Sequence, residues 1–156
     1  MRVGVLSDTH GLLRDPVPAL FEGCEALIHA GDVGQERVLE QLRRVCRVVA
    51  VRGNVDRGYW TKDLPATACV ELGGCLVYIL HDVGRLDLDP RAAGVCVVVY
   101  GHSHQAAVET RDGVLYLNPG SAGPRRFSLP VTVAVLELGR EDAQARIIEV
   151  PTEPGA

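Results

Sequence analysis

The stretch that decides the fold is Val3-Gly4-Val5-Leu6-Ser7-Asp8-Thr9-His10. It begins with a short apolar run, Val3–Leu6, and passes directly into polar residues that include Asp8 and His10. A short run of this kind, rich in β-branched residues and bounded by polar residues, is typical of a buried β-strand. The sequence therefore predicts a strand with a carboxylate and an imidazole just beyond its carboxyl end.

The same pattern recurs along the whole chain. Strands are predicted at Val3–Leu6, Ala26–His29, Val48–Val51, Cys69–Leu72, Leu76–Leu80, Val95–Tyr100, Ala106–Thr110, Val114–Leu117, Val131–Leu138 and Ala145–Val150. Apolar residues at helical spacing predict helices over Pro16–Phe21 and Gln35–Val45. Asp112-Gly113 predicts a tight hairpin turn.

This order of elements predicts an α/β fold. We expect a two-sheet β-sandwich with flanking helices, βαβ units in the first half and mostly antiparallel strands in the second. The length of 156 residues fits a single domain, which we place at residues 1–150, with 151–156 as a loose C-terminal tail.

Composition excludes several classes of protein. Hydrophobic residues make up 47% of the chain, charged residues 23% and aromatic residues 4%, and the net charge is −4. The basic residues are scattered, so we expect no dedicated nucleic-acid surface. No apolar run is long enough to span a membrane. The five cysteines show no CxxC spacing and the N-terminus does not resemble a signal peptide, so we expect a cytoplasmic protein with reduced thiols.

Polar residues gather just past the ends of the apolar runs. The groups are Ser7-Asp8-Thr9-His10, His29-Ala30-Gly31-Asp32, Arg52-Gly53-Asn54-Val55-Asp56, His81-Asp82 and Gly101-His102-Ser103-His104. Ligands of open α/β sheets bind outside the carboxyl ends of the strands. In an extended chain residues i and i+2 point the same way, which predicts that Asp8 and His10 face one point, as do His102 and His104.

Each group alone has a simpler explanation. Asp8-Thr9-His10 fits a helix cap, Gly31-Asp32 and Gly53-Asn54 fit ordinary turns, and His81 fits a histidine bonded to a backbone carbonyl. Their combination, with metal-binding side chains at successive strand ends, favours a metal site over independent turns.

The ordered set Asp8-x-His10, Gly31-Asp32, Gly53-Asn54-x-Asp56, His81 and Gly101-His102-x-His104 resembles the calcineurin-like metallophosphoesterases. It most resembles their small single-domain bacterial and archaeal phosphodiesterase branch, which also carries Asn118-Pro119-Gly120-Ser121. The similarity runs from Met1 to about Arg126.

The resemblance implies a phosphoesterase with two divalent metal ions. One ion would be held by Asp8, His10, Asp32 and His104, and the other by Asp32, Asn54, His81 and His102, with the two oxygens of Asp32 bridging. Such nitrogen and oxygen ligands suit Mn²⁺, our first choice by resemblance, or Ni²⁺, Co²⁺, Fe²⁺ or Zn²⁺. The implied mechanism is in-line attack on phosphorus by a metal-bound hydroxide, with Asp8, Asp32, Asn54 and His81 as the catalytic residues.

Substrate contacts are expected from Asn54, Gly120, Ser121 and Arg125, although a turn after a strand explains Gly120-Ser121 equally well. Many relatives place a histidine directly after the metal-binding Asn, where it protonates the leaving group, but this chain has Val55. General acid assistance is worth ~10²–10⁴-fold, so its absence favours phosphodiesters or esters with acidic leaving groups.

A second departure is Asp82, where the family usually has Gly. It could support a ligand, act as an extra ligand or block the site, and the short segment 83–94 leaves little room for a covering helix. The alternatives to a phosphodiesterase are a non-catalytic interaction scaffold of the same fold, such as a retromer subunit, a nuclease, and a regulatory nucleotide phosphodiesterase. Homo-oligomers are common, and Tyr59 and Trp60 in a predicted loop could serve such an interface.

Overall fold

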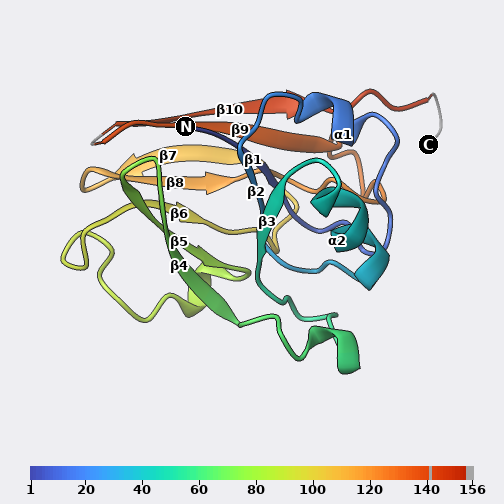
Figure 1. Ribbon diagram of the computed structural model, residues 1–156, viewed down its shortest axis with the longest axis horizontal. Coiled ribbons are helices and arrows are strands. Elements are labelled where there is room, and N and C mark those ends of the chain that lie inside the picture. Colours follow the sequence, from blue (N-terminus) through green and yellow to red (C-terminus); the bar gives the residue numbers. More distant parts are fainter. Residues whose placement is uncertain (141, 154–156) are drawn as a thin grey trace.

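Two five-stranded sheets pack face to face in the computed structural model, which describes residues 1–140 and 142–153 (Figure 1). The strands are β1 Arg2–Leu6, β2 Ala26–His29, β3 Arg47–Ala50, β4 Thr67–Leu72, β5 Cys75–Leu80, β6 Val95–Val99, β7 Ala107–Arg111, β8 Val114–Asn118, β9 Thr132–Leu138 and β10 Ala143–Glu149. The α-helices are α1 Val17–Leu20 and α2 Glu36–Arg43, and the 3-10 helices are η1 Tyr59–Thr61 and η2 Val83–Arg85.

Both sheets are mixed: the first is antiparallel only on its β9–β10 side, whereas the second has antiparallel pairs at both edges. The first has the order β10-β9-β1-β2-β3, in which β1, β2 and β3 are parallel. The second has the order β4-β5-β6-β8-β7, in which β5, β6 and β8 are parallel. The antiparallel β7–β8 hairpin turns at Asp112-Gly113, both with positive φ, as the Asp-Gly pair predicts. The mixed α/β sandwich expected from the sequence is confirmed, and its second half also contains the two parallel pairs of β5, β6 and β8.

The main core lies between the sheets. Strands β1 and β2 are buried on both faces, so that Val3, Val5 and Ile28 face the opposite sheet while Leu6 and Leu27 face the helices. Strands buried on both sides read as continuous apolar runs, which is why the sequence shows no alternation there.

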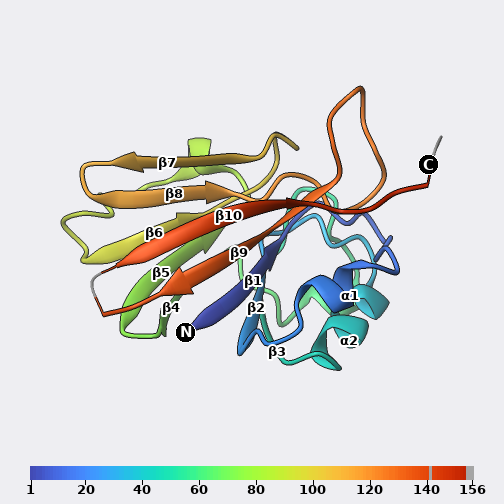
Figure 2. The ribbon, with the colours of Figure 1, turned by 90° about the horizontal axis from the view of Figure 1, so that it is seen from above.

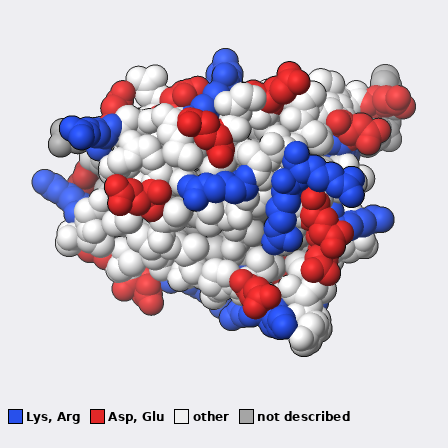
Figure 3. All heavy atoms as spheres, in the orientation of Figure 1, with Lys and Arg blue, Asp and Glu red and all other residues white. Residues whose placement is uncertain are grey.

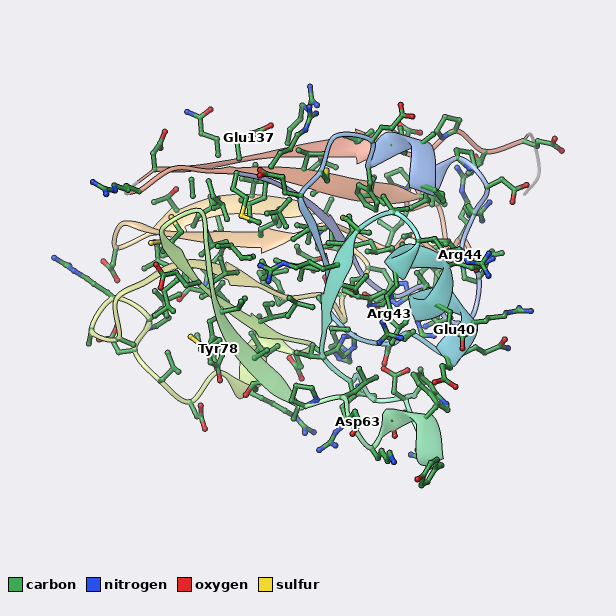
Figure 4. All side chains as sticks on the ribbon, viewed as in Figure 1. Glu40, Arg43, Arg44, Asp63, Tyr78 and Glu137 are labelled. Atoms are coloured by element: carbon green, nitrogen blue, oxygen red, sulfur yellow. The ribbon has the colours of Figure 1, made fainter. Side chains whose placement is uncertain are left out.

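The two α-helices of the described residues lie against the first sheet (Figure 2). Helix α2 buries Val38, Leu39 and Leu42, and its outer residues include Glu40, Arg43 and Arg44 (Figure 4). The outer face of the second sheet instead carries Tyr78, Tyr100 and Tyr116, against which the segment 83–94 packs Val83, Leu86 and Leu88. This segment contains only the 3-10 helix η2, in agreement with the prediction that a covering helix there is very short or missing.

The segment after β10 stays attached to the first sheet. The Val150 amide donates to the Val131 carbonyl at 2.8 Å, and Val150 is buried. Pro151–Glu153 have no regular secondary structure, and residues 154–156 of the expected tail lie outside the described residues. Among the described helices, none combines the length and apolar character needed to cross a membrane.

Phe21 anchors α1 against the first sheet. Its side chain is fully buried and contacts Gly4, where a Cβ atom would come within 2.5 Å of the Phe21 ring. Phe21→Ala should leave a cavity and lower the free energy of unfolding by about 3–5 kcal/mol, measured by urea denaturation. The matched control is Phe127→Ala, because Phe127 is 93% exposed and its loss should change stability by less than about 0.5 kcal/mol. Similar losses in both variants would contradict this packing.

Candidate metal centre

Asp8 lies at the centre of the site and is completely buried. Its Oδ2 accepts hydrogen bonds from the Ser7 hydroxyl at 2.6 Å and the His102 amide at 3.2 Å. Its Oδ1 has no hydrogen-bond partner among the described residues. Burial raises the pKa of Asp8, but the neighbouring His10 and Ser7 outweigh burial and hold the pKa below its ordinary value. Asp8 is therefore a buried carboxylate with one oxygen left without a partner.

Asp32 follows β2 and faces the same point. Its Oδ1 accepts from the Val55 amide at 3.1 Å, which leaves Oδ2 free toward the histidines. Oδ2 lies 3.2 Å from His81 Nε2 and 3.7 Å from His10 Nε2. Burial raises the pKa of Asp32, but the contacts with His81 and the Val55 amide lower it to about 2. Only one oxygen of Asp32 thus lies between the two histidines, instead of the two separate oxygens expected.

Three histidines converge on the carboxylates. Asp8 Oδ1 lies 3.2 Å from His104 Nε2, 3.8 Å from His10 Nε2 and 3.9 Å from His81 Nε2. Their ligand atoms form two overlapping groups that share Asp8, namely Asp8-His10-His104 and Asp8-Asp32-His81.

His81 is held in the orientation of a ligand. Its Nδ1 lies 2.8 Å from the Ala30 carbonyl, which can only accept, so Nδ1 carries the proton and Nε2 presents its lone pair to the carboxylates. Burial lowers the pKa of His81, but Asp32 and Asp8 raise it above the usual value. Asp82, beside it, does not join the cluster: Asp82 Oδ1 accepts from the Gly84 amide and Oδ2 lies 4.0 Å from Arg85 Nε.

The unpartnered atoms fit a metal better than a hydrogen-bond network. Three buried atoms have no hydrogen-bond partner among the described residues: Asp8 Oδ1, His10 Nε2 and His81 Nε2. Both histidine nitrogens nevertheless lie within 4 Å of Asp8 Oδ1. Side-chain atoms that all point at one metal position lie close together, but they are not oriented to form hydrogen bonds with one another. Buried polar atoms left without partners are costly, and a cation with nitrogen and oxygen ligands would satisfy them.

Asn54 and His102 lie at the solvent-exposed side of the cluster. Asn54 Nδ2 is 3.3 Å from His102 Nδ1, and the His102 ring packs edge-on against His81 with centroids 5.2 Å apart. The structure therefore brings all seven predicted ligands to one place.

The backbone reason for this convergence differs from the expected one. Asp8, His10, Asp32, His102 and His104 all have positive φ, between 46° and 74°, so these segments are not extended. The i, i+2 argument was wrong, although the side chains do converge. Residues other than glycine in this region cost of order 1–3 kcal/mol each and concentrate at functional sites.

Asp56 holds two of the loops together. Its buried carboxylate accepts from the Val33 amide at 3.2 Å, the Gly34 amide at 2.8 Å and the Gly53 amide at 2.8 Å. The loop that carries Asp32 is thereby fixed to the loop that carries Asn54. Gly53 is required at this contact, because a Cβ atom there would lie 2.2 Å from Asp32 Oδ1.

His29 is a buried histidine that supports the site. Its Nδ1 accepts from the Gly31 amide at 3.1 Å, so Nε2 carries the proton and donates to Thr9 Oγ1 at 2.9 Å. The Thr9 hydroxyl in turn donates to the Val33 carbonyl. Burial lowers the pKa of His29 to about 4, so the ring is neutral and joins the first two loops.

The predicted substrate residues Gly120 and Ser121 serve the framework of the site. The Gly120 amide donates to Asn118 Oδ1 at 2.9 Å, and the Ser121 hydroxyl donates to the Asp8 carbonyl at 3.1 Å. Asn118 is buried and donates to the Gly101 carbonyl and to Ser103 Oγ. Arg125 lies exposed on the loop between β8 and β9, which projects in Figure 2.

Sequence reasoning missed the roles of Asp56, Asn118 and His29. The only feature of the sequence that could have indicated these roles was the position of the three residues inside or beside the motifs. Their partners are backbone groups of other loops, which no spacing in the sequence identifies.

Comparison with known proteins gives the family of the chain. Residues 1–141 match the family model of the calcineurin-like phosphoesterase superfamily domain. The chain is 31% identical to a probable metallophosphoesterase of Methanocaldococcus jannaschii, over 96% of this chain and 82% of that protein. It is 30% identical to the phosphodiesterase YfcE of Escherichia coli, over 88% of both proteins.

A solved archaeal phosphodiesterase superimposes with a TM-score of 0.78 at 26% identity, covering 95% of this chain and 100% of that one. The zinc complex of Vps29 from Entamoeba histolytica superimposes with a TM-score of 0.76 at 19% identity, over 96% and 99% of the two chains, which shows a shared fold only. Because the family model spans nearly the whole sequence and the relatives match along their lengths, the chain belongs to the calcineurin-like phosphoesterase superfamily.

Proposed function

We propose that the protein is a phosphodiesterase that uses two divalent cations to hydrolyse its substrate by in-line displacement at phosphorus. The observation that carries this proposal is the unpartnered Asp8 Oδ1, on which His10, His81 and His104 converge inside a buried cluster. The relatives named as phosphodiesterases support the reaction class.

The proposed ligand sets overlap at Asp32. One cation would be held by Asp8, His10, Asp32 and His104, and the other by Asp32, Asn54, His81 and His102. The position of Asp32 Oδ2, 3.7 Å from His10 Nε2 and 3.2 Å from His81 Nε2, supports a shared ligand. All ligand atoms are nitrogen or oxygen, so Mn²⁺, our first choice, and Ni²⁺, Co²⁺, Fe²⁺ and Zn²⁺ are all compatible.

The cations, when bound, would lower the pKa of water at the site and neutralise charge on the phosphoryl oxygens. The chain's own residues fix this arrangement: Asp8 and Asp32 supply negative charge, His81 is locked by Ala30, and Asn54 offers its amide at the exposed side. Val55, which follows Asn54, is 47% exposed and has no proton to give a leaving group. This favours phosphodiesters with acidic leaving groups over alkyl phosphomonoesters.

The charge pattern on the face shown in Figure 3 favours a small substrate over long nucleic acid. On the face shown in Figure 3, basic and acidic side chains are interspersed, without a single broad basic patch. Nucleic-acid grooves instead gather positive charge along the path of the phosphates. For the scaffold alternative, the similarity to Vps29 supports the fold alone, whereas the relatives named as phosphodiesterases favour an enzyme.

Asp32→Asn tests the shared ligand. Loss of this carboxylate charge should reduce kcat/KM for bis-p-nitrophenyl phosphate in the presence of Mn²⁺ by more than about 100-fold, since even loss of a residue that supports a ligand costs 10–100-fold. Asp112→Asn is the matched control, because Asp112 lies in the exposed β7–β8 turn and should keep its activity. Near-normal turnover by Asp32→Asn would count against the proposal.

Asp56→Asn tests the positioning of the ligands without changing one. An amide cannot accept on both sides, so one backbone donor loses its partner and the two loops loosen. Mn²⁺ affinity, measured by titration calorimetry, should fall about 10–100-fold. Asp63→Asn is the control, since Asp63 is an exposed residue on the neighbouring segment (Figure 4). Unchanged affinity in Asp56→Asn would show that this carboxylate is dispensable.

A further inference from the structure

A cavity of about 310 Å³ adjoins the candidate metal centre on the side of Asn54 and His81. Its lining consists of Arg52, Gly53, Asn54, Ala66, Thr67, Leu80, His81, Asp82 and Arg85. It shares two proposed metal ligands with the centre, so a group bound at the cations can extend into it. Its size lies at the lower end of the range for small-molecule sites.

The cavity exists because no helix covers this part of the second sheet. The chain leaves β5 at Leu80 and makes only the short η2 at Val83–Arg85, which Asp82 caps by accepting from the Gly84 amide. Asp82 thus lines the cavity and lies beside Arg85, whose exposed Nε is 4.0 Å from Asp82 Oδ2.

Arg52 also lines the cavity, and its exposed side chain has no ion-pair partner among the described residues. Its backbone is fixed, because its amide donates to the Pro65 carbonyl at 2.9 Å. Its guanidinium makes one long contact, 3.5 Å to the Leu64 carbonyl, and has no carboxylate within 4.0 Å in the part of the chain that the structure describes. Because Asp82 balances Arg85, the cavity keeps one net positive charge and several free N–H donors.

The chemistry of these walls matches a phosphorylated group. Guanidinium ions bind phosphate through paired hydrogen bonds, and Ala66, Leu80 and Thr67 add apolar atoms to the lining. We infer that the cavity binds the substituent of the diester substrate that is not displaced, and that this substituent carries a second phosphate. This inference rests on the proposed phosphodiesterase function and specifies its substrate class.

The test uses two p-nitrophenyl esters that differ by a single phosphate. One is the p-nitrophenyl ester of thymidine 5′-phosphate, and the other is the same ester with an additional 3′-phosphate. Charge-assisted hydrogen bonds predict that the 3′-phosphate raises kcat/KM by about 10-fold or more. Arg52→Met and Arg85→Met should each reduce this ratio, and the double variant should bring it close to one.

Arg91→Met is the matched control. Arg91 lies on the same 83–94 segment, is exposed and does not line the cavity, so the ratio should stay as in the wild type. A wild-type ratio near one, with both esters hydrolysed, would overturn the inference and leave the proposed function intact.

A binding measurement with thymidine 3′,5′-bisphosphate distinguishes failure of this inference from failure of the proposed function. If neither ester is hydrolysed, the phosphodiesterase assignment fails, and calorimetric titration of the metal-stripped protein with thymidine 3′,5′-bisphosphate still tests the cavity. Weaker binding by Arg52→Met than by Arg91→Met would support an anion site in the cavity, and equal binding by both variants would overturn it.

Discussion

The buried charge of Asp8 is the constraint on which the rest of the site depends. A carboxylate removed from water must be compensated by hydrogen bonds or cations, and the described residues donate hydrogen bonds to only one of the Asp8 oxygens. The other oxygen faces three histidine rings that are not aligned to donate to it. Bound cations would complete such a cluster, and this is the physical basis of the proposed function.

The loops that carry the ligands are held by hydrogen bonds between one another. Asp56 joins the loops after β2 and β3, Asn118 joins the loop after β6 to the end of β8, and Ser121 reaches the carbonyl of Asp8. These contacts offset the cost of the left-handed backbone at five of the proposed ligands. The two sheets thus contribute to one site through loops that would not take these conformations alone.

Much of this organisation could be predicted from the sequence, because strands buried on both faces leave apolar runs and ligands follow their ends. The features that could be predicted in this way are the strands, helix α2 and the convergence of Asp8, Asp32 and His81. The left-handed conformations of His10 and His104 could not be predicted, since contacts between distant loops impose them. The cavity beside Arg52 was equally hidden, because it depends on how the segment 83–94 packs on the tyrosines of the second sheet.

The most direct test of the central claim is anomalous diffraction at the manganese edge from crystals of the Mn²⁺-loaded protein. The account predicts two peaks about 3.5–4 Å apart, with Asp32 between them, one beside His10 and His104 and the other beside His81 and His102. A single peak, or manganese bound away from Asp32, would contradict it.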